Sequence, residues 1–144
     1  PYVFLPYYYP LDYTPYWWLV KRYGLLQYQC VMPPKAVKPL LRCVTQRPLL
    51  MSRKRFGDIP SVGMLSFARP GVALAMDFID HGESTLRMLK ELDGVLIEEG
   101  GALYPAKDGR MSQFMFRCSF PQRWREFSKY VDPGFSSDFW KRVQ

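Results

Sequence analysis

The strongest indication of the fold comes from residues 72–104, VALAMDFIDHGESTLRMLKELDGVLIEEGGALY. Residues 72–78 are apolar except for Asp77 and predict a central β-strand. A turn follows, and apolar residues then recur at helical spacing, which predicts an amphipathic helix over residues 83–99. The apolar stripe of this helix is expected to comprise Leu86, Leu89, Leu92, Val95 and Leu96.

The end of this stretch also contains the first candidate functional residue. The pair Gly100-Gly101 ends the helix, and residues 102–104 predict a short strand before a turn with Lys107 and Asp108. A lysine held at the end of a strand can act as a positioned charge instead of a solvated surface group. Because Tyr104 lies three residues earlier, we expect a ligand to reach both side chains.

The preceding residues predict further strands and a second long helix. Residues 25–32 alternate so that Gln27 and Gln29 share one face of a strand. A Pro-Pro pair opens a helix over residues 33–46. The other expected elements are a short helix over 16–23, strands over 48–52 and 61–67, and a basic loop over 53–60 between these strands.

The last third of the chain predicts helices over 111–118 and 122–130 and a short helical turn over 136–142. The order of elements favours an α+β fold: a mainly antiparallel sheet with helices packed on one face, plus a C-terminal helical segment. We treat residues 1–144 as one domain. The start of the chain, rich in proline and aromatic residues, suggests that it continues from an upstream domain.

Composition and charge leave several classes of function open. Hydrophobic residues make up 48% of the chain, which is typical of a globular domain, and the aromatic content of 17% is high. The net charge of +7 is compatible with a basic, aromatic-rich nucleic-acid or ligand-binding module without catalysis, or with a structural interaction domain. However, the basic residues are scattered, and the longest run is Arg53-Lys54-Arg55. We therefore expect no nucleic-acid partner.

The chain contains no self-sufficient catalytic motif. Its three cysteines, Cys30, Cys43 and Cys118, form no CxxC pair, and its single histidine, His81, lies in a turn, so we expect no metal site. No glycine-rich dinucleotide or phosphate loop is present. Buried free thiols suit a reducing compartment, which favours a cytoplasmic location, with membrane association or the periplasm as alternatives.

Five stretches carry a resemblance to a known family. They are YYPLD (8–12), LQYQ (26–29), KRFG (54–57), AMDF (75–78) and GGALYPAKD (100–108). On these residues the chain resembles the C-terminal, substrate-side part of FAD-linked oxidoreductases of the vanillyl-alcohol-oxidase type. Within that family it is most similar to the oxidases of decaprenylphosphoryl-ribose and to sugar and aldonolactone oxidases.

The resemblance implies a division of labour between two domains. An upstream domain would bind FAD, and residues 1–144 would form the cap and substrate-binding domain. The reaction would be oxidation of a sugar or lactone hydroxyl, on a substrate that can be phosphorylated, with hydride transfer to the flavin. The isolated chain is then expected to be inactive and to self-associate through the surface that the FAD domain would cover.

The resemblance also implies roles for individual residues. Lys107 and Tyr104 would be catalytic and would contact the flavin, and the substrate would be bound by Tyr8, Gln27, Gln29 and Lys54. The chemistry agrees: a lysine stabilises developing negative charge, glutamines bind hydroxyls, and a basic group suits a phosphate. Ala75 stands where some members of the family have a cysteine, a difference in the wall of the pocket.

Overall fold

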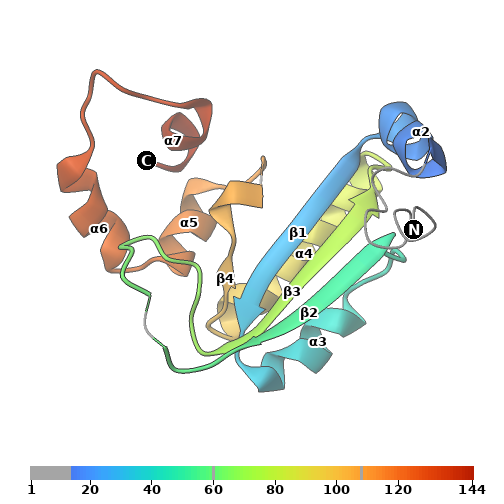
Figure 1. Cartoon of the computed structure of the whole chain (residues 1–144), viewed down its shortest axis with the longest axis horizontal. Helices are drawn as coiled ribbons and strands as arrows, with labels where there is room; N and C mark the ends of the chain where they lie inside the picture. Colours follow the sequence, from blue (N-terminus) through green and yellow to red (C-terminus); the bar gives the residue numbers. More distant parts are fainter. Residues whose placement is uncertain (1–13, 60, 108) are drawn as a thin grey trace, which may run out of the picture.

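The computed structural model describes residues 14–59, 61–107 and 109–144 (Figure 1). A four-stranded antiparallel sheet, in the order β2-β3-β1-β4, forms the centre of the domain. Helices pack on one face of the sheet, and a C-terminal helical segment lies beside β4, so the predicted α+β class is confirmed. The strands are β1 (Leu25–Met32), β2 (Leu50–Phe56), β3 (Gly71–Ile79) and β4 (Ala102–Leu103).

The two central strands pair along their whole length. Their register runs from Leu25 opposite Ile79 to Met32 opposite Val72. Directly opposite residues point to the same side of an antiparallel sheet, so the alternation in β1 determines which residues of β3 share each face. The prediction of a central strand at 72–78 and of alternation over 25–32 is confirmed.

One face of the sheet forms the main core with helix α4 (Glu83–Glu98). In Figure 1, α4 lies behind β1 and β3. Each fully buried large apolar side chain contributes about 1.5–3 kcal/mol to folding. The buried residues that meet here are Tyr28, Cys30 and Met32 of β1, Leu74, Met76 and Phe78 of β3, and Leu89, Leu92 and Leu96 of α4.

The first turn of α4 differs from the predicted apolar stripe. Leu86 is 45% exposed, whereas Thr85 is fully buried. The Thr85 hydroxyl accepts a hydrogen bond from the backbone N–H of His81 at 2.9 Å and lies 3.2 Å from the Gln46 side-chain oxygen. Hydrogen bonding at the start of the helix therefore turns Thr85 inward and Leu86 outward, which the apolar pattern alone does not predict.

The second long helix is shorter than predicted. A 3₁₀ turn, η3 (Pro34–Ala36), leads into α3 (Val37–Arg42), which ends well before residue 46. Pro39 has no backbone N–H, and it fits because it occupies the first turn of α3. Pro48 disfavours helical geometry at the residue before it. Leu41 of α3 is 37% exposed, whereas Leu40 beside it is fully buried.

The predicted boundaries of the edge strand are wrong. β2 runs to Phe56, so residues 53–56 form a strand and not a loop, while residues 61–67 form a turn and coil and not a strand. The cause is tertiary: β3 offers partners from Asp77, opposite Leu50, to Gly71, opposite Phe56. Pairing with a long central strand overrides the weak intrinsic preference of this basic stretch.

The ends of the described chain follow the predicted helical pattern. Helix α2 (Thr14–Tyr23) ends at Gly24, which has a φ of +81°. Ser112 and Ser137 accept backbone hydrogen bonds at the starts of α5 and α7. The C-terminal elements are α5 (Gln113–Ser119), α6 (Arg123–Phe127), the 3₁₀ turn η5 (Ser128–Tyr130) and α7 (Asp138–Val143).

The glycine pair after α4 forms a tight C-terminal cap. Gly100 has a φ of +70°, its N–H bonds to the Ile97 carbonyl at 3.0 Å, and the Gly101 N–H bonds to the Leu96 carbonyl at 2.8 Å. This is the Schellman arrangement. A Cβ at Gly101 would collide with the Leu96 side chain and lie 2.8 Å from the Val31 carbonyl oxygen.

We expect Gly101→Ala to lower the free energy of unfolding by about 1–3 kcal/mol, because the added methyl group has no room. The matched control is Gly94→Ala, where nothing lies within 4 Å of the added Cβ. Gly94 is inside α4, so alanine there should raise the stability by about 0.5–1 kcal/mol. Urea denaturation of the full chain measures both, and equal effects would contradict the packing described here.

Candidate functional site

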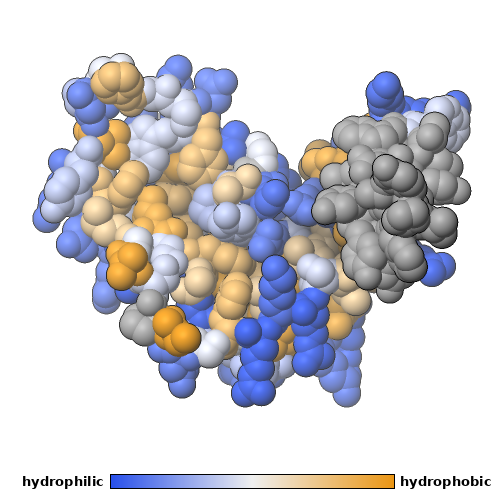
Figure 2. Space-filling model, in the orientation of Figure 1, coloured by the Kyte–Doolittle hydropathy of each residue, from blue (hydrophilic) through white to orange (hydrophobic). Residues whose placement is uncertain are grey.

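The second face of the sheet is not covered by any described helix. At the β4 end it carries a small apolar cluster of Val31, Phe67, Ala73 and Ala102. Beside this cluster lies a hollow of about 580 Å³, whose lining includes Phe67 and Ala73 of the cluster. Figure 2 shows hydrophilic side chains along the β2 edge of this side. Residues that line the hollow include Gln29, Ser52, Lys54, Phe56, Ala75 and Tyr104.

The strand register explains the shape of this hollow. Ala75 in β3 lies opposite Gln29 of β1 on one side and Ser52 of β2 on the other. Ala73, one step along the same face, lies opposite Lys54. Small side chains therefore form the floor, and polar side chains from the two neighbouring strands form the walls.

Tyr104 closes the β4 side of the hollow. Its backbone N–H bonds to the Gln29 carbonyl at 2.8 Å, which continues the strand pairing beyond Leu103. Its ring packs on Phe67 with the ring centroids 4.7 Å apart, and Phe67 in turn meets the edge of Phe56. Tyr104 is thus held by both backbone pairing and aromatic packing.

The two glutamines that share this face differ in their surroundings. The Gln27 amide donates a hydrogen bond of 2.7 Å to the carboxylate of Asp77, which lies directly opposite in β3 and is only 6% exposed. Gln29 lines the hollow, and the structure gives its side chain no hydrogen bond within the described residues. Gln29 therefore has free donor and acceptor capacity for a ligand, whereas the Gln27 amide is engaged with Asp77.

Lys107 lies outside the lining of this hollow. It is exposed at the end of the 3₁₀ turn η4 (Pro105–Lys107), where its backbone N–H bonds to the Tyr104 carbonyl at 3.3 Å. It borders an adjacent open depression together with Phe139 and Arg142. Tyr104 and Lys107 thus share one turn, but they line different cavities.

The structure brings together three of the predicted site residues: Gln29, Lys54 and Tyr104. Lys54 is part of the edge strand and not of a loop, which places it on the same face as Ala73. Tyr8 lies outside the described residues. Sequence reasoning missed Ser52, although it precedes Lys54 by two residues and would share its face once the strand is extended.

Cys30 lies on the opposite, buried face and takes no part in the hollow. Burial raises the pKa of its thiol from 9.0 to about 12, so it is protonated at neutral pH and unsuited to nucleophilic chemistry. Within the described ranges, no group of histidine, cysteine, aspartate and glutamate side chains is arranged to bind a metal. Nor is any described helix long and apolar enough to cross a membrane.

Comparison with known proteins finds relatives that extend beyond this chain. No family model matches it. Decaprenylphosphoryl-beta-D-ribose oxidase of Mycolicibacterium smegmatis is 35% identical over 152 aligned residues, covering 96% of this chain and 32% of that protein. An uncharacterized protein in the mprA 5′ region of Streptomyces coelicolor is 32% identical over 105 residues, covering 70% of this chain and 28% of that protein. The chain thus spans about a third of the length of the curated relatives that it matches.

The contrast between the glutamines predicts different effects on stability. Gln27→Ala removes the amide that bonds to the buried Asp77 carboxylate and should cost about 1–3 kcal/mol. Gln29→Ala should change the free energy of unfolding by less than about 0.5 kcal/mol. Chemical denaturation of the two variants measures this difference. If Gln29→Ala were the more destabilising change, the assignment of Gln29 as the free amide would be wrong.

The buried thiol predicts a pH effect. Because the pKa of Cys30 is higher in the folded chain, the stability that it contributes is complete below pH 9 and is lost as the pH rises toward about 12. The free energy of unfolding of the wild type should fall across that range more steeply than that of Cys30→Ala. Equal slopes for the two proteins would show that Cys30 is not shielded from water.

Proposed function

We propose that this chain is the substrate-side domain of an FAD-dependent oxidoreductase that oxidises a hydroxyl of a sugar or aldonolactone. The main support for the proposal is that Gln29, Lys54 and Tyr104 line the same hollow. These three residues come from three different sequence stretches on which the family resemblance rests. The similarity to an oxidase over 96% of the chain supports the oxidoreductase class.

The sheet face that no described helix covers would suit a planar cofactor. Its floor is formed by alanines at positions 73 and 75, and longer side chains there would fill the hollow. When bound, the flavin would accept the hydride of the substrate. Tyr104 and Lys107, on one turn at the border of this face, are the residues of this chain proposed to contact it. Most of the FAD contacts would come from another part of the polypeptide, because the sequence has no dinucleotide-binding loop.

The polar walls suit a hydroxylated substrate. The free Gln29 amide can donate to one hydroxyl and accept from another, and the Ser52 hydroxyl faces the same space. Lys54 adds a positive charge at the exposed edge, where it can bind a phosphate carried by the substrate. Tyr8 and Gln27 remain proposed substrate residues, with Gln27 acting through its bond to Asp77.

Lys107 is proposed to act through its charge. Loss of hydride from a hydroxyl-bearing carbon requires loss of the hydroxyl proton, and an ammonium group stabilises the oxyanion or the negative charge on the reduced cofactor. The 3₁₀ turn that follows β4 ties the backbone of Lys107 to Tyr104. This rigid attachment suits a positioned charge better than a long loop would.

We expect Lys107→Met to lower the rate of flavin reduction about 100-fold or more in the full-length polypeptide, with little loss of stability. Lys90→Met, on the exposed side of α4, is the matched control because it removes the same charge outside the site. Stopped-flow measurement of flavin absorbance gives both rates. Equal reduction rates in the two variants would show that Lys107 is a solvated surface residue without a role in flavin reduction.

A further inference from the structure

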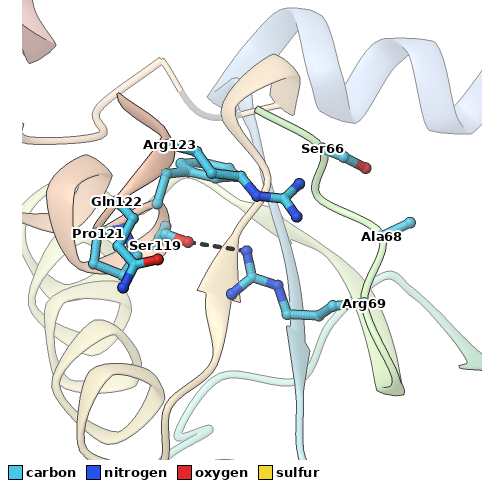
Figure 3. A pocket seen from close by; sticks show the side chains of 8 residues that line it. Ser66, Ala68, Arg69, Ser119, Pro121, Gln122 and Arg123 are labelled. Atoms are coloured by element: carbon cyan, nitrogen blue, oxygen red, sulfur yellow. Dashed lines mark hydrogen bonds between the residues drawn. The ribbon is translucent and has the colours of Figure 1, made fainter. Parts of the chain in front are cut away.

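A second pocket adjoins the hollow across the segment 63–70 and lies between this segment and the corner that joins α5 to α6. Its volume is about 220 Å³ (Figure 3). Two guanidinium groups extend into it from opposite walls, Arg69 from the segment and Arg123 from α6. None of the side chains that line it is a carboxylate.

Each guanidinium group is anchored through one hydrogen bond. Arg69 donates to the Ser119 carbonyl at 2.9 Å and lies 5.7 Å from the ring centroid of Phe120. Arg123 donates to the Gly63 carbonyl at 3.3 Å. Since a guanidinium group has five N–H donors in a planar fork, both arginines keep donors for a ligand while their position is constrained.

The electrostatics of the pocket favour an anion. Burial lowers the pKa of Arg69, and the nearby charge of Arg123 lowers it further. Neither Arg69 nor Arg123 belongs to an ion pair within the described residues. The pairs found there are Lys35 with Glu99 and Arg110 with Asp93. An anion between the two guanidinium groups would offset the burial of one charge and the repulsion between the two.

We propose that Arg69 and Arg123 form a binding site for a tetrahedral oxyanion of the phosphate type, either free or as the phosphoryl group of a lipid headgroup. Two guanidinium forks that approach from different walls match the several oxygens of a phosphate better than the two coplanar oxygens of one carboxylate. The pocket shares Ser66 and Ala68 with the hollow on the sheet face, so the segment 63–70 separates the two sites. The inference does not depend on the proposed oxidation.

The first test is a calorimetric titration of inorganic phosphate into the full chain. We expect saturable binding that weakens at least 10-fold in Arg69→Gln and in Arg123→Gln. Arg87→Gln, an exposed arginine of α4, removes the same charge elsewhere and should bind as the wild type does. If phosphate binding is absent, or equal in all four proteins, the proposal is overturned.

The second test separates ligand binding from a purely structural role. Without phosphate, Arg123→Gln should melt at or above the temperature of the wild type, because it removes the repulsion of Arg69. With phosphate, the melting temperature of the wild type should rise and that of Arg123→Gln should not. A variant that melts lower than the wild type by the same margin in both buffers would show that Arg123 is only a structural tether.

A further variant and a vesicle-binding experiment complete the test. If Arg69→Gln does not fold, Arg69→Lys preserves the charge but removes the planar guanidinium group, and it should still weaken phosphate binding.

Sedimentation with phosphatidylcholine vesicles, with and without phosphatidic acid, identifies the source of the phosphoryl group. Binding to phosphatidic acid that is lost in Arg123→Gln supports a lipid headgroup, whereas binding of inorganic phosphate alone supports a soluble ligand. Vesicle binding that is unchanged in Arg123→Gln, without binding of free phosphate, overturns the site.

Discussion

The rest of this domain depends on the unbroken antiparallel pairing of β1 with β3. Because side chains alternate along each strand, one register assigns every residue of both strands to a face. Tyr28, Cys30 and Met32 then meet α4 in the core, while Gln27 and Gln29 must face the other way. A slip by one residue would bury the glutamines under α4 and expose the core residues, so burial of the core strongly stabilises this register.

The same pairing makes the sheet face a rigid platform for binding. Strand residues are positioned more accurately than loop residues, and Gln29, Ala75 and Ser52 form a row across three strands. The neighbouring pair Gln27–Asp77 is also a direct cross-strand pair, but it is satisfied internally. Adjacent rows of one face thus have different roles, one structural and one open to a ligand.

The positively charged side chains of the domain are not all solvated surface groups. Arg110 forms a bidentate pair with Asp93, with distances of 2.7 and 3.0 Å, and its guanidinium group lies over the ring of Tyr28. Arg69 and Arg123, in contrast, face each other across a pocket without a lining carboxylate. The net charge of +7 therefore includes arginines that are paired with a carboxylate and arginines that are available to a ligand. Only the three-dimensional arrangement distinguishes the two kinds.

Elements whose signals are local could be predicted from the sequence. Alternation over residues 25–32, the apolar strand at 72–78, the long amphipathic helix and the glycine pair that caps it are all encoded by neighbours in the chain. The end of β2, in contrast, depends on long-range pairing, because its partner β3 is distant in the sequence. This pairing places Lys54 on the sheet face. The Gln27–Asp77 bond and the Arg69–Arg123 pocket likewise join residues some fifty positions apart, and no local pattern can predict which distant side chains the fold brings together.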